Sequence, residues 1–186
     1  MATEALKSLS ITNSDASPIL ANTIGEGAPG MLRVANDHVV STAGMLLAST
    51  YRTCRIPTTA KIKQVLLSCA AHGGAAAADI DIAFSDSTTD GTQPSLQGGV
   101  VQLSGPVDNK LFGAATTLVS ALKNSDITFA NTFTTTFQNV PLWQVLVTLA
   151  ATQFTTDPGG FFDLMIKTTA TDTNGGDLAI AVYYVE

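Results

Sequence analysis

Apolar and polar residues alternate with a period of two in several stretches of the chain, a pattern typical of β-strands with one buried face. The clearest stretch is 79–84, where the apolar residues are expected to point into a core and Asp79 and Asp81 out to solvent. Clusters of turn-forming residues separate such stretches. The pattern predicts an all-β protein built as an antiparallel β-sandwich. The other expected strands, in chain order, are 31–40, 45–56, 61–70, 100–103, 116–122 (a strand or a turn), 127–129, 132–137, 161–171 and 177–185.

A tight connection at 57–60 predicts that the strands on either side of it form a β-hairpin, with Ile56 opposite Lys61. In that hairpin Cys69 would lie roughly 20 Å along the strand from the position opposite Cys54. Because a disulfide needs a much shorter separation, we expect two buried free thiols.

A second hairpin is predicted near the end of the chain. Asn-Gly-Gly at 174–176 joins the strands 161–171 and 177–185, and Asn-Gly supplies the positive φ angles that a hairpin turn requires. Asp163 and Lys167 are expected on the face of the first strand opposite to its apolar residues. Antiparallel pairing of these two strands is therefore expected.

The pattern of residues 141–149 predicts one short helix. Pro141 stands at a favourable first position, and four apolar residues follow at helical spacing. Trp143 lies on the apolar stripe, so core packing is its expected role. The residues of the stripe are Leu142, Val145, Leu146 and Leu149.

The chain is expected to contain one sandwich domain, 31–186, preceded by a segment, 1–30, with isolated apolar residues and no sustained period. This segment is either an arm that becomes ordered against a partner or a first strand and loop of the same domain. If it is an arm, its contact residues are expected to be Leu6, Leu9, Ile11, Ile19, Leu20 and Ile24.

Composition excludes several classes of protein. The 186 residues carry 9 Lys and Arg against 15 Asp and Glu, and the net charge of −6 repels a phosphate backbone, so nucleic acid is not an expected partner. No apolar run approaches the roughly 20 residues of a membrane-spanning helix. The first residues lack the basic start and apolar block of a secretion signal, so we expect synthesis and folding in a cytoplasm.

Candidate chemistry is sparse. His38 lies in strand-like sequence and His72 in a glycine turn, and neither belongs to a nucleophile motif, so both are expected at the surface. Asp79 and Asp81 resemble a carboxylate pair, but the loop after them lacks the ligand spacing of a calcium site. Neither Gly-Gly pair opens a helix as a phosphate loop does. No catalytic residue, metal or cofactor is therefore expected.

The stretch 51–62, Tyr-Arg-Thr-Cys-Arg-Ile-Pro-Thr-Thr-Ala-Lys-Ile, resembles the signature Tyr-Arg-x-x-Arg-[Val/Ile]-Pro-[Ser/Thr]-x-Ala-x-Ile of small jelly-roll proteins of tailed bacteriophages. These are the capsid cement, or decoration, proteins of short-tailed phages. The order of the matches carries the resemblance, which spans about residues 31–186 and departs at 83–86, where the family more usually has Leu-Tyr-Asp. Further matches are Ala76–Ile80, Leu111–Ala114, Pro141–Leu146, Asp157–Pro158, Phe162–Leu164 and Gly175–Val185.

The resemblance implies a jelly-roll-like sandwich without enzymatic activity, located in the virion on the outer face of the capsid and made in the host cytoplasm. It implies binding to the major capsid protein as a homo-oligomer, with a trimer favoured over a dimer, and the six apolar residues of segment 1–30 become candidate capsid or subunit contacts. Two alternatives stay open: a receptor- or glycan-binding jelly roll of a phage fibre or tail, marked by exposed aromatic residues in loops, and a hydrolase on a sandwich scaffold.

Overall fold

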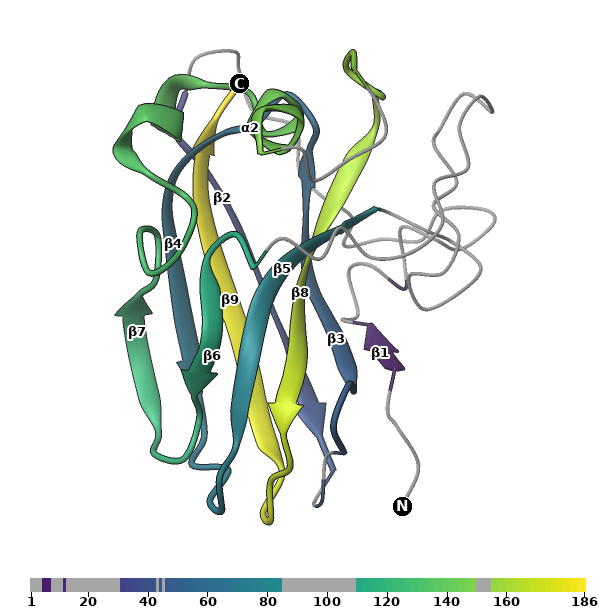
Figure 1. The fold of residues 1–186 in the computed structure, drawn as a ribbon, viewed down its shortest axis with the longest axis vertical. Helices are drawn as coiled ribbons and strands as arrows, with labels where there is room; N and C mark the ends of the chain where they lie inside the picture. The colour runs from purple at the N-terminus through teal and green to yellow at the C-terminus, as the bar shows by residue number, and fades with distance from the viewer. Residues whose placement is uncertain are drawn as a thin grey trace.

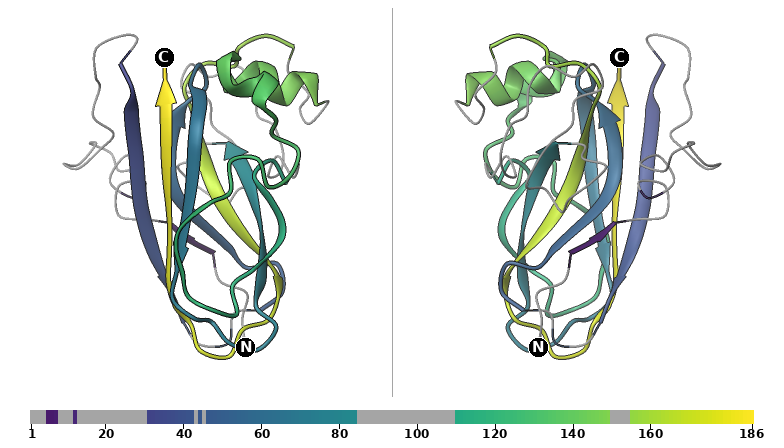
Figure 2. Two further views of the ribbon diagram at one scale, coloured as in Figure 1. Left: turned by 90° about the vertical axis from the view of Figure 1, so that its left-hand side faces the viewer. Right: turned by 90° about the vertical axis from the view of Figure 1, so that its right-hand side faces the viewer.

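The computed structural model describes residues 5–7, 12, 31–42, 44, 46–84, 110–149 and 155–186. These residues form two stacked β-sheets, with one short α-helix at one end of the stack (Figure 1). Seen from the sides, the two sheets face each other across a shared interior (Figure 2). The predicted all-β sandwich with one short helix is confirmed.

The two sheets differ in size, with five strands in the first and four in the second. All neighbouring strands are antiparallel except β1 and β3, which are parallel. The first sheet, in spatial order, consists of β1 (Ala5–Lys7), β3 (Thr50–Pro57), β8 (Phe161–Ala170), β5 (Ala77–Phe84) and β6 (Gly113–Thr117). The second consists of β2 (Arg33–Ser41), β9 (Gly176–Val185), β4 (Lys61–Cys69) and β7 (Leu122–Asp126).

From β2 onward the strand pairing is nested. β2 pairs with β9, β3 with β8, β4 with β7 and β5 with β6, so that the first strand of the set pairs with the last and the two middle strands with each other. This is the pairing order of a jelly roll, in which successive antiparallel strand pairs are distributed over two stacked sheets. Successive strands therefore fall in opposite sheets at most of the connections.

Both predicted hairpins are wrong for this reason. β3 and β4 lie in different sheets, as do β8 and β9, so the connections 57–60 and 171–175 cross from one sheet to the other. The turn residues were identified correctly, since Gly175 and Gly176 have φ angles of 64° and 146°. Turn chemistry fixes local backbone geometry, whereas the choice of pairing partner depends on the burial of the whole chain.

The two cysteines are free and buried, as predicted, although the predicted reason was wrong. Cys54 lies on β3 and Cys69 on β4, in opposite sheets rather than along one hairpin. Burial raises the pKa of the Cys54 thiol to about 12 and also raises the pKa of Cys69.

The core lies between the sheets and is closed at one end by α2 (Leu142–Thr148), which confirms the predicted helix. The backbone N–H of Leu142 donates to the carbonyl of Ala60 (2.8 Å), and that of Trp143 to Thr58 (3.0 Å), which fixes the helix to the β3–β4 turn. Trp143 is partly buried against the core, in its predicted role. The helix residues that enter the core are Leu142, Val145 and Leu146.

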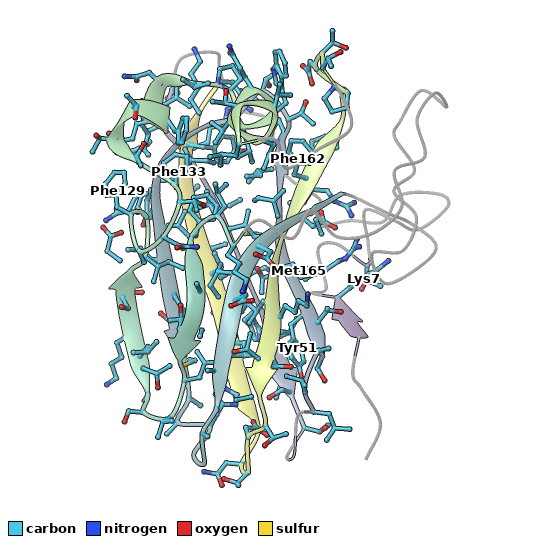
Figure 3. The ribbon with its side chains drawn as sticks, in the orientation of Figure 1. Lys7, Tyr51, Phe129, Phe133, Phe162 and Met165 are labelled. Carbon is cyan, nitrogen blue, oxygen red and sulfur yellow. The ribbon has the colours of Figure 1, made fainter. Side chains whose placement is uncertain are left out.

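Two of the expected strands near α2 are absent. Residues 127–129 lead into a turn, and 132–137 run into a 3₁₀ turn, η1 (Thr135–Asn139). Phe133 instead packs its ring against Phe112 at a centroid distance of 5.2 Å, which explains the apolar positions in this stretch. Phe129 and Phe133 lie at the α2 end of the molecule (Figure 3). The expected strand 100–103 lies outside the described residues.

The outer face of the first sheet carries a layer of buried charged residues, contrary to expectation. Asp79, Asp81 and Asp163 do lie on the strand faces opposite to the core, but they are buried instead of solvated. Lys110 explains part of this, because its backbone N–H donates to Asp81 Oδ1 at 2.7 Å and its Nζ lies 3.4 Å from Asp79 Oδ2. The backbone N–H of Ala115 donates to Asp79 Oδ1 at 2.8 Å.

Asp163 is the acceptor for two buried arginines of β3. Arg55 donates through Nε to Oδ1 (2.7 Å) and through a terminal nitrogen to Oδ2 (3.1 Å), and Arg52 donates to Oδ2 at 3.2 Å. The bidentate contact of Arg55 fixes the relative orientation of the two side chains and also pairs their charges. Alternation in the sequence identified the correct strand face, but it could not show that this face is covered.

Replacing Asp163 with Asn is expected to lower the free energy of unfolding by about 3–5 kcal/mol, because two buried guanidinium groups lose their carboxylate. Urea denaturation followed by circular dichroism measures the change. Asp177→Asn is the control, since Asp177 is exposed on β9, and it should change the value by less than about 0.5 kcal/mol. Equal effects of the two substitutions would contradict the buried charge layer.

The thiols are expected to resist modification in the folded protein. With a pKa of about 12 for Cys54, the thiolate is scarce at neutral pH, and burial excludes the reagent from both cysteines. A chromogenic disulfide reagent at about pH 8 should label neither thiol within minutes under native conditions and both in denaturant. Rapid native labelling, or an intramolecular disulfide after mild oxidation, would be inconsistent with their placement.

Candidate interaction surface

Four connections between strands gather at the end of the sandwich away from α2 (Figure 1). They are 42–49, of which 43 and 45 lie outside the described residues, and 70–76, 118–121 and 171–175. We call this surface the loop end. Nested pairing brings these four segments together although up to about 130 residues separate them along the chain.

A buried histidine and aspartate hold the loop end together. His72 is fully buried, and its Nδ1 lies 2.8 Å from Asp172 Oδ2. The carboxylate of Asp172 also accepts the backbone N–H of Gly44 at 3.0 Å and of Gly175 at 3.1 Å. One side chain thus ties three of the connections to each other.

The backbone of His72 adds the fourth connection. Its N–H donates to the carbonyl of Leu118 at 3.1 Å, and its own carbonyl accepts the N–H groups of Thr173 and Asn174 at 3.2 Å each. The expectation that His72 lies at the surface is wrong, whereas His38 is exposed as expected. Gly73 and Gly74 form the turn with φ angles of 67° and 59°, so the histidine can face inward where the glycine-rich sequence suggested a solvated loop.

The outside of the loop end lacks exposed charge, and its apolar residues alternate with exposed neutral polar ones, Thr42, Thr171, Thr173 and Asn174. The four connections contain no Lys, Arg or Glu, and Asp172 and His72, the only titratable residues among them, are both buried. Leu47 is 61% exposed and Val119 39% exposed. The exposed small residues between them are Ala71, Gly74, Ala75, Ser120 and Ala121. Exposed apolar surface free of charge is typical of the centre of a protein interface.

A second apolar surface follows the strand β2. Met31, Leu32, Val34 and Val40 are between 54% and 62% exposed. β2 stands at the edge of its sheet, and it pairs with β9 from Arg33 to Ser41 without a register shift. It contains neither proline nor lysine, the residues that commonly protect an edge strand from association. We call this surface the β2 edge.

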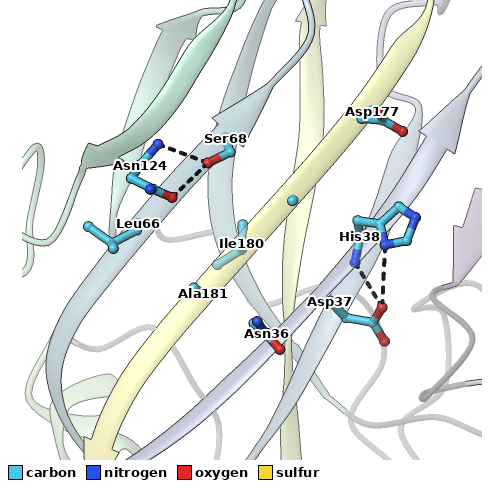
Figure 4. A pocket seen from close by; sticks show the side chains of 10 residues that line it. Asn36, Asp37, His38, Leu66, Ser68, Asn124, Asp177, Ile180 and Ala181 are labelled. Carbon is cyan, nitrogen blue, oxygen red and sulfur yellow. Dashed lines mark hydrogen bonds and ion pairs between the residues drawn. The ribbon is translucent and has the colours of Figure 1, made fainter.

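The outer face of the second sheet holds a shallow depression of about 550 Å³ (Figure 4). Its lining includes neither Trp, Tyr nor Phe, so it lacks the aromatic ring on which a sugar stacks. Tyr184 is buried in the core and Tyr183 half-buried. The lining residues are Asn36, Asp37, His38, Leu66, Ser68, Asn124, Asp177, Ala179, Ile180 and Ala181.

Two features are absent from the described residues. They contain no group of three or more His, Cys, Asp or Glu that could hold a metal ion, and no helix among them is long and apolar enough to cross a membrane. Asp79 and Asp81, the candidate carboxylate pair, accept backbone N–H groups and bind Lys110. Their visible role is to hold the segment after residue 109 against β5.

The predicted contact residues of segment 1–30 are only partly described. The backbone of Leu6 lies in β1 and pairs with that of Tyr51 on β3, which attaches the beginning of this segment to the sandwich. The other five, Leu9, Ile11, Ile19, Leu20 and Ile24, lie outside the described residues. Sequence reasoning missed the loop end, since its four segments are unremarkable singly and their shared lack of charge has meaning only when they are adjacent.

No protein-family model matches the sequence, and no curated protein matches it at a significant level. A chain of the cyanophage Pam1 capsid asymmetric unit is similar to this protein, with 15% sequence identity over 92% of this chain and 96% of that chain and a TM-score of 0.40.

Replacing Asp172 with Ala is expected to lower the free energy of unfolding by about 2–4 kcal/mol, because His72 and two backbone N–H groups lose a buried acceptor. His38→Ala, which changes the exposed histidine, should alter stability by less than about 0.5 kcal/mol. Thermal and urea denaturation measure both variants. A stable Asp172→Ala protein would show that the pair does not hold the loop end.

Proposed function

We propose that this protein is a structural virion protein, a cement or decoration protein that binds the outer surface of a phage capsid as a homo-oligomer and stabilises the shell. Its partners are the major capsid protein and further copies of itself, with a trimer favoured because threefold positions on a shell match closed threefold symmetry. The proposal includes no enzymatic activity and no cofactor.

The observation that carries the proposal is that the motifs of the resemblance contact one another in the fold. Arg52 and Arg55 of the first motif bind Asp163 of the Phe-Asp-Leu motif. The Thr58 hydroxyl of the first motif donates to Asp157 of the Asp-Pro motif at 2.7 Å. Direct contacts therefore join three of the matched motifs, which supports reading them as one structural unit.

The first motif also accounts for the packing at the α2 end. Its apolar residues are fully buried, and its turn accepts the two backbone hydrogen bonds that fix α2. These buried apolar residues are Tyr51, Ile56, Ala60 and Ile62. The residues of the first motif thus specify how the sandwich closes at this end, and contacts with partners are made by surface residues.

The surface supports an assembly role. A shell-bound oligomer needs one surface for its own copies and another for the shell, and the loop end and the β2 edge, which adjoin at the end of β2, are two surfaces that could serve these roles. The net charge of −6 disfavours contact with the genome and is compatible with an exterior position. The ionisable pairs of the described interior hold strands and turns together, which is a structural use of such groups.

Shells that carry the protein are expected to open at a higher temperature than shells without it, because a ligand that binds only the intact shell stabilises it by mass action, by about 2.7 kcal/mol per site at 100 times the dissociation constant. Differential scanning fluorimetry with a nucleic-acid dye measures the opening. An unrelated acidic protein of similar size serves as control. Identical opening temperatures at saturating protein would refute the proposed function.

A further inference from the structure

We propose that the loop end is the surface that docks on the shell, against an uncharged patch of the major capsid protein that presents apolar and hydrogen-bonding groups, and that several loop ends of one oligomer bind at once. This inference rests on the proposed function and specifies which face of the molecule is used and what chemistry its partner presents.

The distribution of charge points to the loop end. Elsewhere on the described surface, charged side chains such as Lys110, Asp126 and Asp157 are exposed, whereas the four connections of the loop end expose none and the nearest exposed charges, Lys123 and Asp177, stand in the adjoining strands. Burying such a surface against a protein costs no desolvation of ions, and the exposed Leu47 and Val119 gain from leaving water. The complementary partner is an uncharged surface, because a charged one would be buried without a counter-ion, and it presents hydrogen-bonding groups to the exposed Thr171, Thr173 and Asn174.

The described residues of the loop end are tied to one another by hydrogen bonds. The carboxylate of Asp172 holds the first, second and fourth connections, and the N–H of His72 binds the third. Loops that are already fixed lose little conformational entropy on binding, so more of the contact energy appears as affinity. The His72–Asp172 pair ties turns together at the end of the molecule away from α2. A surface used for docking would benefit from this fixed arrangement of turns.

The area of the loop end disfavours a second copy of this chain as its occupant. Two sheets about 10 Å apart with their outer side chains give a depth of roughly 20 Å, and four strands about 4.8 Å apart give a similar width. One loop end therefore offers roughly 400 Å², and two copies end to end would bury about 800 Å², below the roughly 1,200 Å² of a stable protein pair. An end-to-end dimer would be weak.

The same small area suits a contact that is repeated. When an oligomer places several loop ends on one shell, each further contact forms at high effective concentration, and weak single contacts combine into tight attachment. The β2 edge lies along the side of the molecule and stays available for contacts between copies while the loop end faces the shell. Attachment is thus expected to depend on the oligomeric state.

The test compares the wild type with three single variants in binding to shells that lack the protein. Leu47→Asp and Ala75→Asp place a carboxylate on the loop end, and Ala130→Asp places one on the exposed alanine that follows Phe129, a residue at the α2 end (Figure 3). Ala75→Asp and Ala130→Asp form a matched pair, since both alanines are exposed in turns. Co-sedimentation measures binding, analytical ultracentrifugation the oligomeric state, and thermal denaturation the folding of each variant.

We expect Leu47→Asp and Ala75→Asp to weaken shell binding by about 100-fold or more, because each subunit of the oligomer buries an unpaired carboxylate. Their oligomeric state and melting temperature should match the wild type, and Ala130→Asp should bind normally. Wild-type affinity should change by less than about twofold between about 50 and 500 mM salt, since no exposed charge enters the contact.

The outcomes separate this inference from the proposed function. If the wild type binds shells and the two loop-end variants bind equally well, the inference is wrong and the proposed function stands. If those variants lose oligomerisation instead, the loop end contacts another copy, and the inference is again wrong. If the wild type does not bind shells at any concentration tested, the proposed function fails and the inference fails with it.

Discussion

Nested strand pairing is the constraint on which the rest of this structure depends. β2 pairs with β9, β3 with β8, β4 with β7 and β5 with β6. Because of this nesting, the two sheets share one core and most connections pass from one sheet to the other. The same constraint gathers four connections at the loop end and leaves α2 to close the other end. The interaction surface is therefore a consequence of topology, assembled from segments that have no relation along the chain.

Local sequence signals predicted elements more reliably than their partners. The strands around residues 33–41, 50–57, 61–69, 77–84, 161–170 and 176–185, the helix and the free thiols were all predictable, since alternation, helical spacing and turn residues are short-range properties. The two hairpins were not, because pairing is decided by which arrangement buries both sheets. Asp163 and His72 were misplaced for a related reason: alternation identifies a strand face, and glycine a turn, but neither shows what covers them.

Buried polar contacts here specify geometry. Arg52 and Arg55 on Asp163 fix β3 against β8, and His72 on Asp172 fixes the turns at the loop end, so each buried charge or ring has a partner from a distant part of the chain. Replacing such groups with apolar residues could preserve stability yet lose the defined arrangement. This explains how a chain with 13% charged residues, and no disulfide among its described residues, presents a rigid surface.

The most direct measurement of the central claim is an electron cryomicroscopy map of shells incubated with this protein. The account predicts sandwich-shaped density on the outer surface at symmetric positions, with the loop end against the shell and α2 pointing away from it. Density in which α2 or the outer face of a sheet meets the shell would contradict the docking surface, and shells without added density at saturating protein would contradict the assembly role itself.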